Sequence, residues 1–225
     1  MTTVAAPSLI DRCADVLATA YESKKLVGLS GASVDVFPTG MTRASGEALT
    51  QLIAKERATN FLEVGLGLGL STVFLSLGIL QHRETFDALT LDPFQERGWD
   101  SVGLETIRRA GLSEFVEFAA KHSEYALPRL AEAGAKFDFI FVDGGHLFDN
   151  VFVDTFYAIR LVRPGSLIVL DDRWMPAVQK AAAFFVSNLG LVDESAEQGT
   201  PGYRFIYLRV PETLPERKWD HYTAF

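Results

Sequence analysis

The sequence lacks paired cysteines and long apolar runs. Its one cysteine, Cys13, excludes an internal disulfide and is compatible with a reducing compartment. No apolar run reaches the length of about 18 residues that a membrane-spanning helix needs. The N-terminus also has no basic stretch followed by an apolar core, which a secretory signal would require. We therefore expect a cytoplasmic protein that does not enter a membrane.

Basic residues are scarce as well. The 225 residues include 21 Lys and Arg against 29 Asp and Glu, which gives a formal net charge of -8 and a pI near 5.0. Because nucleic-acid affinity comes mainly from clustered Lys and Arg, we expect no nucleic-acid partner. The sequence has no internal repeat and no shift of composition along its length. We expect one domain over 1–225, with a helix and loop at 1–40, a core at 41–210 and a tail at 211–225.

The stretch FLEVGLGLGLST, residues 61–72, organises the rest of the chain. Its first four residues have the character of the end of a buried strand. Gly65, Gly67 and Gly69 predict a turn whose backbone a ligand can approach closely. A helix is expected to begin near Ser71, whose hydroxyl suits an N-cap position. A strand, a glycine turn and a helix N-terminus together predict a ligand site at the carboxyl end of a parallel sheet.

The spacing of the glycines bears on which ligand this turn accepts. A dinucleotide fingerprint would place a third glycine at position 70, where the sequence has Leu70. A nicotinamide-dependent oxidoreductase is therefore disfavoured. A tight strand-to-helix turn in any α/β protein remains a purely structural interpretation of the same glycines.

An acidic residue follows the next predicted strand, 88–91. Asp92 at the end of this strand could accept two hydrogen bonds from a ribose diol, as in many nucleotide-binding folds. The alternative is a structural role, because Asp before Pro93 is a common way to open a turn. The spacing from the glycine turn favours the ribose interpretation.

Two longer apolar runs end in carboxylates. The run 137–142 is followed by Asp143, and the run 166–170 by Asp171 and Asp172. If these runs are neighbouring parallel strands, their ends lie side by side and the three carboxylates meet. Carboxylates that converge in one cleft repel one another unless a cation lies among them. Oxygen ligands select a hard ion, so we expect Mg²⁺, with Mn²⁺ or Ca²⁺ as alternatives.

Helices alternate with these strands along the chain. Helical spacing of apolar residues predicts helices at 8–27, 44–57, 71–80, 124–133, 148–162 and 176–189, and another around 107–112. Alternation predicts further strands at 115–118 and, as an antiparallel final pair, at 191–192 and 204–208. The segment 28–40 is rich in Gly, Ser and Pro and predicts a loop.

The core from about Met41 to Asp172 resembles the metal-dependent O-methyltransferases of class I, which use S-adenosylmethionine. It is similar both to the catechol and caffeoyl-coenzyme A type and to the bacterial type that methylates antibiotic sugars. The motifs that carry the resemblance are EVGLGLGLS, FIFVDGGH and LIVLDD. The fold that the resemblance implies is an α/β, Rossmann-like, doubly wound sheet of seven strands, mostly parallel with an antiparallel final strand and with helices on both faces.

The resemblance also implies roles for individual residues. Asp143, Asp171 and Asp172 match the metal ligands of the family, and Asp92 matches the acid that binds the ribose. Ser123 lies in the loop that borders the adenine ring, although it could equally be the N-cap of helix 124–133. The residues expected to bind S-adenosylmethionine are therefore Glu63, at the methionine end, with Gly65, Gly67, Gly69, Ser71, Asp92 and Ser123.

His146 falls where the catechol type places its basic residue. Relatives of the antibiotic-sugar type instead have an acidic base two residues after the first metal ligand, where this chain has Gly145. His146, with Asp143 beside it, is the expected catalytic base because neutral imidazole is available near pH 7. The alternative is a histidine that binds a loop carbonyl or shapes the cleft.

These features predict the metal-assisted transfer of a methyl group to a hydroxyl of a small molecule, such as a phenol, diol or sugar of specialised metabolism. The metal would lower the pKa of the hydroxyl and fix its oxygen in line with the sulfonium methyl. Trp174 and Met175 are interpreted as walls for a ring-shaped acceptor. Two alternatives are a metal-independent N- or C-methyltransferase of the same fold and a non-catalytic cofactor-binding protein.

The assembly of the protein is the least determined feature. The tail 211–225 ends in Trp219, Tyr222 and Phe225, which favours docking against a partner subunit over fraying. A homodimer is the expectation only because such dimers are the commonest assemblies.

Overall fold

The structure, a computed structural model, describes residues 7–225. Its centre is a seven-stranded sheet with the order β5-β4-β3-β6-β7-β9-β8. The strands are β3 (Asn60–Val64), β4 (Asp87–Leu91), β5 (Val116–Ala119), β6 (Phe137–Val142), β7 (Val162–Leu170), β8 (Val192–Asp193) and β9 (Ile206–Arg209). Within this sheet β9 is antiparallel to both of its neighbours, whereas the other pairings are parallel. The predicted strand arrangement is confirmed.

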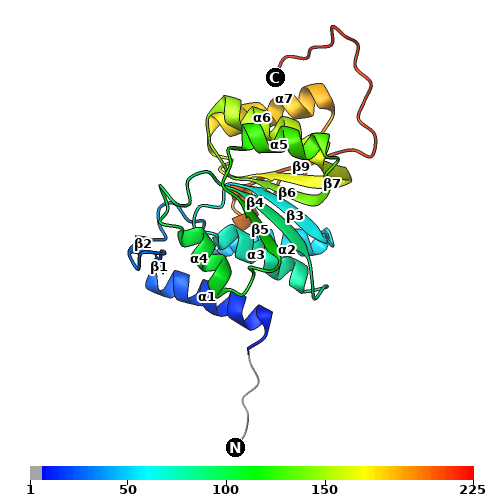
Figure 1. Cartoon of the computed structure of the whole chain (residues 1–225). Coiled ribbons are helices and arrows are strands. Elements are labelled where there is room, and N and C mark those ends of the chain that lie inside the picture. The colour runs from blue at the N-terminus through cyan, green and yellow to red at the C-terminus, as the bar shows by residue number, and fades with distance from the viewer. Residues whose placement is uncertain (1–6) are drawn as a thin grey trace, which may run out of the picture.

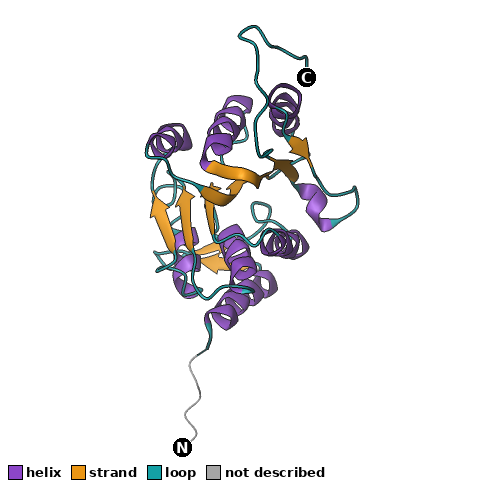
Figure 2. Cartoon of the chain, turned by 90° about the vertical axis from the view of Figure 1, so that its right-hand side faces the viewer, coloured by secondary structure: helices purple, strands orange, loops and turns teal. Residues whose placement is uncertain are grey.

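Helices cover both faces of the sheet (Figure 1). One layer contains α1 (Leu9–Ser23), α2 (Arg43–Lys55), α3 (Leu70–Leu80) and α4 (Val102–Arg109), and the other contains α5 (Ser123–Glu132), α6 (Phe148–Leu161) and α7 (Pro176–Leu189). The view in Figure 2 shows the strands between the two sets of helices. This is the doubly wound α/β fold that the sequence predicted.

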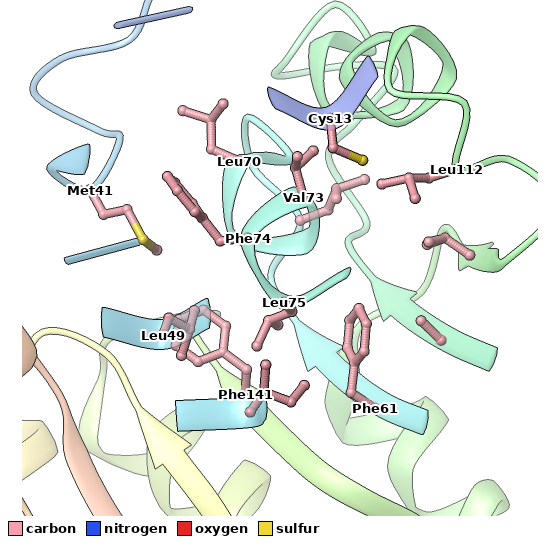
Figure 3. Packing of buried hydrophobic residues seen from close by; sticks show 14 of the residues in the cluster. Cys13, Met41, Leu49, Phe61, Leu70, Val73, Phe74, Leu75, Leu112 and Phe141 are labelled. Atoms are coloured by element: carbon pink, nitrogen blue, oxygen red, sulfur yellow. The ribbon is translucent and has the colours of Figure 1, made fainter. Parts of the chain in front are cut away.

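Each helical layer encloses its own hydrophobic core. Side chains of β6 alternate between the two: Phe139 and Phe141 pack with α1 to α4, whereas Ile140 and Val142 pack with α5 to α7. Figure 3 shows the first core, in which Phe141 points toward the helices and Cys13 is buried. Because β6 is covered on both faces, it needs apolar residues at nearly every position, which explains its continuous apolar run.

The register of the central strands aligns their carboxyl ends. Val64 of β3 is paired with Leu91 of β4 and with Val142 of β6, and Val142 is paired with Leu170 of β7. These are the last residues of their strands. The residues that follow each strand therefore emerge at one edge of the sheet.

The N-terminal segment differs from the sequence-based prediction. The helix expected over 8–27 ends at Ser23, and Lys24 adopts a left-handed conformation with a φ of 56°. The next residues form a hairpin, β1 (Lys25–Val27) with β2 (Ser33–Asp35), within the region predicted to be helix and loop. In β1, Leu26 is buried while Lys25 and Val27 are exposed, so burial alternates from residue to residue as in a strand. The helical pattern of the preceding residues concealed this short alternation in the sequence.

The prediction that a hydroxyl caps helix α3 is also wrong. The N-cap is Gly69, which has a φ of 75° and no side chain to offer. Ser71 and Thr72 lie inside the first turn and donate hydrogen bonds to the Glu63 carboxylate. A buried carboxylate behind the turn competes for the two hydroxyls and leaves capping to the glycine backbone.

The C-terminal tail returns to its own chain. The backbone of Thr223 exchanges two hydrogen bonds with the Asn188 side chain on α7, at 2.7 and 2.8 Å. The Phe225 ring packs against Phe184 with a centroid distance of 5.0 Å. Trp219, in contrast, is 98% exposed. Among the residues that the structure describes, no helix combines the length and apolar character needed to span a membrane.

Candidate functional site

Two neighbouring cavities lie at the carboxyl edge of the sheet. The first, of about 460 Å³, is lined by Asp92 and Ser123 and is here termed the Asp92 cavity. The second, of about 430 Å³, is lined by His146 and Asp172 and is termed the Asp172 cavity. Their shared walls are formed by Gly65, Gly67, Trp99, Asp143 and Gly144. A ligand that filled both cavities would therefore cross the glycine turn.

The glycine turn is packed directly against the end of β6. A Cβ atom on Gly65 would lie 2.0 Å from the carbonyl oxygen of Asp143, and the residue has a φ of 93°. Any side chain at position 65 would therefore clash with backbone and strain the turn. Gly67 has open space on its Cβ side and lines both cavities. The turn thus combines a packed glycine with one that leaves its backbone accessible to a ligand.

Glu63 supports the turn from behind. Its side chain is fully buried and accepts hydrogen bonds from Ser71 and Thr72. Burial raises the pKa of Glu63 to about 7, although the two hydroxyls offset part of the rise. Ser71 lines the Asp172 cavity, whereas Glu63 does not line it and contacts it only through its hydrogen bond with Ser71. Glu63 therefore acts on the cavity through Ser71.

Asp92 fixes the other side of the turn. Its carboxylate accepts hydrogen bonds from the backbone N–H of Gly67 at 2.9 Å and of Phe94 at 2.8 Å. The amide of Gln95 donates to Asp92 at 2.9 Å and to the Gly67 carbonyl at 2.8 Å. Gln95 was not predicted from the sequence, where the only signal is an amide side chain three positions after Asp92; the structure shows that this side chain is buried. Together these contacts hold the turn open toward the Asp92 cavity.

Ser123 is placed at the wall of the Asp92 cavity, as the first residue of α5. The N-cap of that helix is His122, so the capping role considered for Ser123 is wrong. Behind Ser123 lies Asp154 of α6, a residue that sequence reasoning also missed. It is 1% exposed, and its carboxylate oxygens have no hydrogen-bond partner of good geometry in the described part of the chain.

The second cavity brings together Asp143, His146 and Asp172. The Nε2 atom of His146 lies 2.8 Å from Oδ2 of Asp172 and 3.5 Å from Oδ1 of Asp143. One ligand atom from each of the three residues lies within 4.8 Å of the others. The flanking carboxylates raise the pKa of His146 to about 10, first through Asp143 and then through Asp172. Burial, followed by the charge of Asp171, raises the pKa of Asp143.

Asp171 points away from this group. Its side chain is fully buried and receives a bidentate interaction from Arg204, with Nε to Oδ1 at 2.6 Å and Nη2 to Oδ2 at 2.8 Å. Asp172 has a φ of 56°. Its carboxylate contacts both Arg204 and His146, whereas the Asp171 carboxylate contacts Arg204 and not His146. The structure therefore places two of the three expected metal ligands together with His146, and the third against Arg204.

Arg204 itself had no signal in the sequence. It ends the short helix η1 (Pro201–Arg204), and its guanidinium lines the Asp172 cavity. Trp174 and Met175 line the same cavity, and Trp174 is 59% exposed. The Arg204 guanidinium carbon lies 5.2 Å from the centre of the Trp174 ring. An acceptor in this cavity would thus meet an aromatic wall, a guanidinium and two carboxylates.

Residues 62–173 match the family model described as "Methyltransferase domain". These residues include the glycine turn and all three aspartates. The chain carries a methyltransferase domain.

Relatives of this methyltransferase domain share the core of the chain. A catechol O-methyltransferase of Niastella koreensis is 33% identical over 129 residues, which cover 56% of this chain and 55% of that protein. A caffeoyl-CoA O-methyltransferase of Petunia hybrida is 30% identical over 130 residues, covering 56% and 51%. The chain thus spans about half the length of the curated relatives that it matches.

Solved structures confirm the methyltransferase fold over nearly the whole chain. An O-methyltransferase from Bacillus cereus, solved in complex with SAH, superposes with a TM-score of 0.64 and 22% identity. The superposition covers 93% of each chain. The Rossmann-like architecture therefore extends beyond the residues that the family model matches.

The buried carboxylate of Asp154 leads to a prediction about the stability of the methyltransferase domain. Burial raises the pKa of Asp154 from 3.8 to about 6, and Ser123 offsets part of the rise. Between these values the folded state holds more protons than the unfolded state, so this carboxyl makes stability fall as the pH rises from about 4 to about 6. Replacement by Asn is expected to remove the fall, which amounts to about 3 kcal/mol at 1.36 kcal/mol per pKa unit.

The measurement is urea unfolding of the wild type and Asp154→Asn at pH values from 4 to 8. We expect the stability advantage of the variant to grow up to about pH 6 and then to stay constant. Asp149→Asn, an exposed change on the same helix, is the matched control. A difference between Asp154→Asn and wild type that does not change with pH would contradict the prediction.

Proposed function

We propose that the chain transfers a methyl group from S-adenosylmethionine to a hydroxyl of a small molecule, with a divalent cation beside that hydroxyl. The observation that carries the proposal is the shared wall between the Asp92 cavity and the Asp172 cavity. A ligand that extended from the first cavity past Gly67 would meet the group formed by Asp143, His146 and Asp172. The names of the relatives, catechol and caffeoyl-CoA O-methyltransferase, support a phenol or diol as acceptor. A sugar hydroxyl of specialised metabolism is the other acceptor class.

The cofactor residues follow from this arrangement. In the proposal, the ribose diol lies at Asp92 and the adenine ring at Ser123, both in the Asp92 cavity. The methionine end crosses Gly65, Gly67 and Gly69 toward Ser71, and Glu63 holds that hydroxyl in place. The sulfonium then faces the Asp143 carboxyl group in the shared wall.

The donor set of the Asp172 cavity fits a divalent cation. Asp143 and Asp172 offer carboxylate oxygens, whereas the His146 nitrogen within the same 4.8 Å is reserved in this proposal for the proton of the acceptor. These carboxylates would hold Mg²⁺, or another hard cation, close to the acceptor. When bound, the cation would stabilise the deprotonated acceptor oxygen. Asp171, the third expected ligand, is held by Arg204 and would have to leave it in order to bind the cation.

The remaining chemistry belongs to the side chains. The Nε2 atom of His146 is the proposed acceptor of the hydroxyl proton, and it lies 3.5 Å from Asp143 and 2.8 Å from Asp172. Because these two carboxylates raise the pKa of His146 to about 10, the imidazole would be neutral near pH 7 only where a cation at Asp143 and Asp172 offsets their charge. Trp174 and Met175 orient the acceptor and limit the access of water. The methyl group then passes directly from sulfur to oxygen.

One observation favours a second candidate, a metal-independent N- or C-methyltransferase on the same fold. The guanidinium of Arg204 already neutralises carboxylates that the metal-dependent relatives would use for metal. In that enzyme the carboxylates would only organise hydrogen bonds. Cofactor binding without any turnover would instead indicate a non-catalytic cofactor-binding protein.

The assembly of the protein and its location in the cell are also proposals. Homodimer formation is proposed because Trp219 and Tyr222 of the tail are largely exposed. A cytoplasmic location rests on the single, buried Cys13.

The proposed cofactor-binding site in the Asp92 cavity is tested by replacing Asp92. Asp92→Ala removes the acceptor for the ribose and for the Gly67 amide, so the affinity for S-adenosylhomocysteine is expected to fall about tenfold or more. Calorimetric titration measures the affinity. Asp87→Ala, at the exposed opposite end of the same strand, is the control and should bind like wild type. Equal affinity of wild type, Asp92→Ala and Asp87→Ala for S-adenosylhomocysteine would rule out the proposed role of Asp92.

The proposed reaction is tested by turnover on catechols, diols and sugars, with the metal removed by EDTA and then restored. We expect EDTA to abolish methyl transfer and Mg²⁺ to restore it. His146→Gln is expected to lower kcat about 100-fold or more, with unchanged binding of S-adenosylhomocysteine, whereas the tail variant His221→Gln should match wild type. Turnover that resists EDTA would support the metal-independent candidate, and full activity of His146→Gln would exclude this residue as the base.

A further inference from the structure

Arg204 makes the densest set of charged contacts at the carboxyl edge. Its Nε and Nη2 atoms hold both oxygens of Asp171, and Nη2 also donates to Oδ1 of Asp172 at 2.8 Å. The backbone of the same residue is fixed, because its carbonyl accepts a hydrogen bond from the N–H of Arg173 at 2.9 Å. The short helix η1 that carries it is held to α2 through a hydrogen bond from Ser45 to the Pro201 carbonyl at 3.2 Å. The guanidinium is therefore part of the wall of the Asp172 cavity.

These contacts use three of the roughly four acceptor positions of the Asp171 carboxylate. Its Oδ1 atom accepts from Arg204 and also from the backbone N–H of Asp172, at 2.6 and 2.7 Å. Its Oδ2 atom accepts from Arg204, and the side chain has no exposed surface. Asp171 cannot bind a cation in the cavity without breaking the bidentate pair with Arg204.

Asp172 is divided between two partners. One of its oxygens faces Arg204 at 2.8 Å, and the other faces His146 at 2.8 Å. A cation held by Asp143 and Asp172 would therefore share the Asp172 carboxylate with a guanidinium. Because a guanidinium keeps its charge at all accessible pH values, two cations would compete for one carboxylate.

We propose that Arg204 is a positioning residue that competes with the divalent cation for Asp172 and keeps Asp171 away from it. This inference rests on the proposed function, since it concerns the cation of that reaction. It predicts a weak cation site in the wild type and a stronger one when the guanidinium is removed. By reciprocity, a bound cation weakens the hold of Arg204 on Asp172. The Trp174 ring, 5.2 Å from the guanidinium carbon, offers Arg204 a neighbouring contact.

The test is the affinity for Mn²⁺ alone, measured by the electron paramagnetic resonance of free Mn²⁺ during titration in the presence of S-adenosylhomocysteine. Arg204→Met removes the charge and keeps most of the side-chain length. We expect it to bind Mn²⁺ on the order of tenfold more tightly than wild type. Adding Asp171→Asn to Arg204→Met should lower the Mn²⁺ affinity again in part, because the Asp171 carboxylate freed from Arg204 is the additional ligand.

Two further variants complete the experiment. Arg204→Lys keeps a positive charge but cannot hold both oxygens of Asp171, so its Mn²⁺ affinity should lie between those of wild type and Arg204→Met. Arg173→Met is the matched control, because Arg173 contacts the Tyr203 ring and the Ala196 carbonyl rather than the carboxylates. It should bind Mn²⁺ within about twofold of wild type, because the change removes a partly buried guanidinium that contacts neither Asp171 nor Asp172.

The outcomes separate this inference from the proposed function. If both Arg204 variants bind Mn²⁺ as weakly as wild type or more weakly, the competition is overturned. S-adenosylhomocysteine titration of the same samples shows that the site is intact, and it tests the cofactor site independently of the cation. Mn²⁺ binding that appears only after Arg204 is removed would support the competition while overturning the metal-assisted reaction of the wild type.

Discussion

The shared register of β3, β6 and β7 is the constraint on which the site depends. Hydrogen bonds continue this register one residue beyond the strands, from the N–H of Asp143 to the Val64 carbonyl at 2.8 Å and from the N–H of Asp171 to the Val142 carbonyl at 3.0 Å. A shift by one residue would exchange the two faces of each strand and bury the wrong side chains in both cores. The packing of the two cores therefore fixes the register, and the backbone hydrogen bonds of Asp143 and Asp171 fix where their carboxylates emerge.

This fixed edge carries an unusual balance of charge for an acidic protein. Asp143, Asp171 and Asp172 bring three carboxylates together, while Arg204 and His146 bring the opposing cations. The arrangement separates the carboxylates by role, since Asp171 forms a buried ion pair and the other two face the cavity. A buried ion pair of this geometry orients its neighbours at the cost of desolvating two charges. In the proposed competition, this pairing also weakens the attraction of the edge for a divalent cation.

Much of this was predictable, because it followed from local patterns. The glycine turn and the apolar runs of β6 and β7 established the parallel sheet and placed Asp143 near Asp172. The partners Arg204, Gln95 and Asp154 could not be predicted, because none follows a short motif. Arg204 and Asp154 also reach the site from other parts of the chain, whereas Gln95 is only three residues from Asp92. The different contacts of Asp171 and Asp172, and the left-handed φ of 56° at Asp172, could not be read from the dipeptide. In the N-terminal hairpin, the short alternation around Leu26 was too brief to compete with the helical pattern before it.

The proposed reaction and the proposed role of Arg204 both require a cation site made by Asp143 and Asp172, with Asp171 retained by Arg204. The most direct measurement is a crystal structure of the protein grown with S-adenosylhomocysteine and Mn²⁺, with anomalous scattering used to locate the manganese. The account predicts an anomalous peak within bonding distance of Asp143 and Asp172, at the acceptor side of the cofactor sulfur, and an intact pair between Arg204 and Asp171. A peak bonded to Asp171 with Arg204 displaced, or a fully occupied cofactor with no peak at this edge, would contradict it.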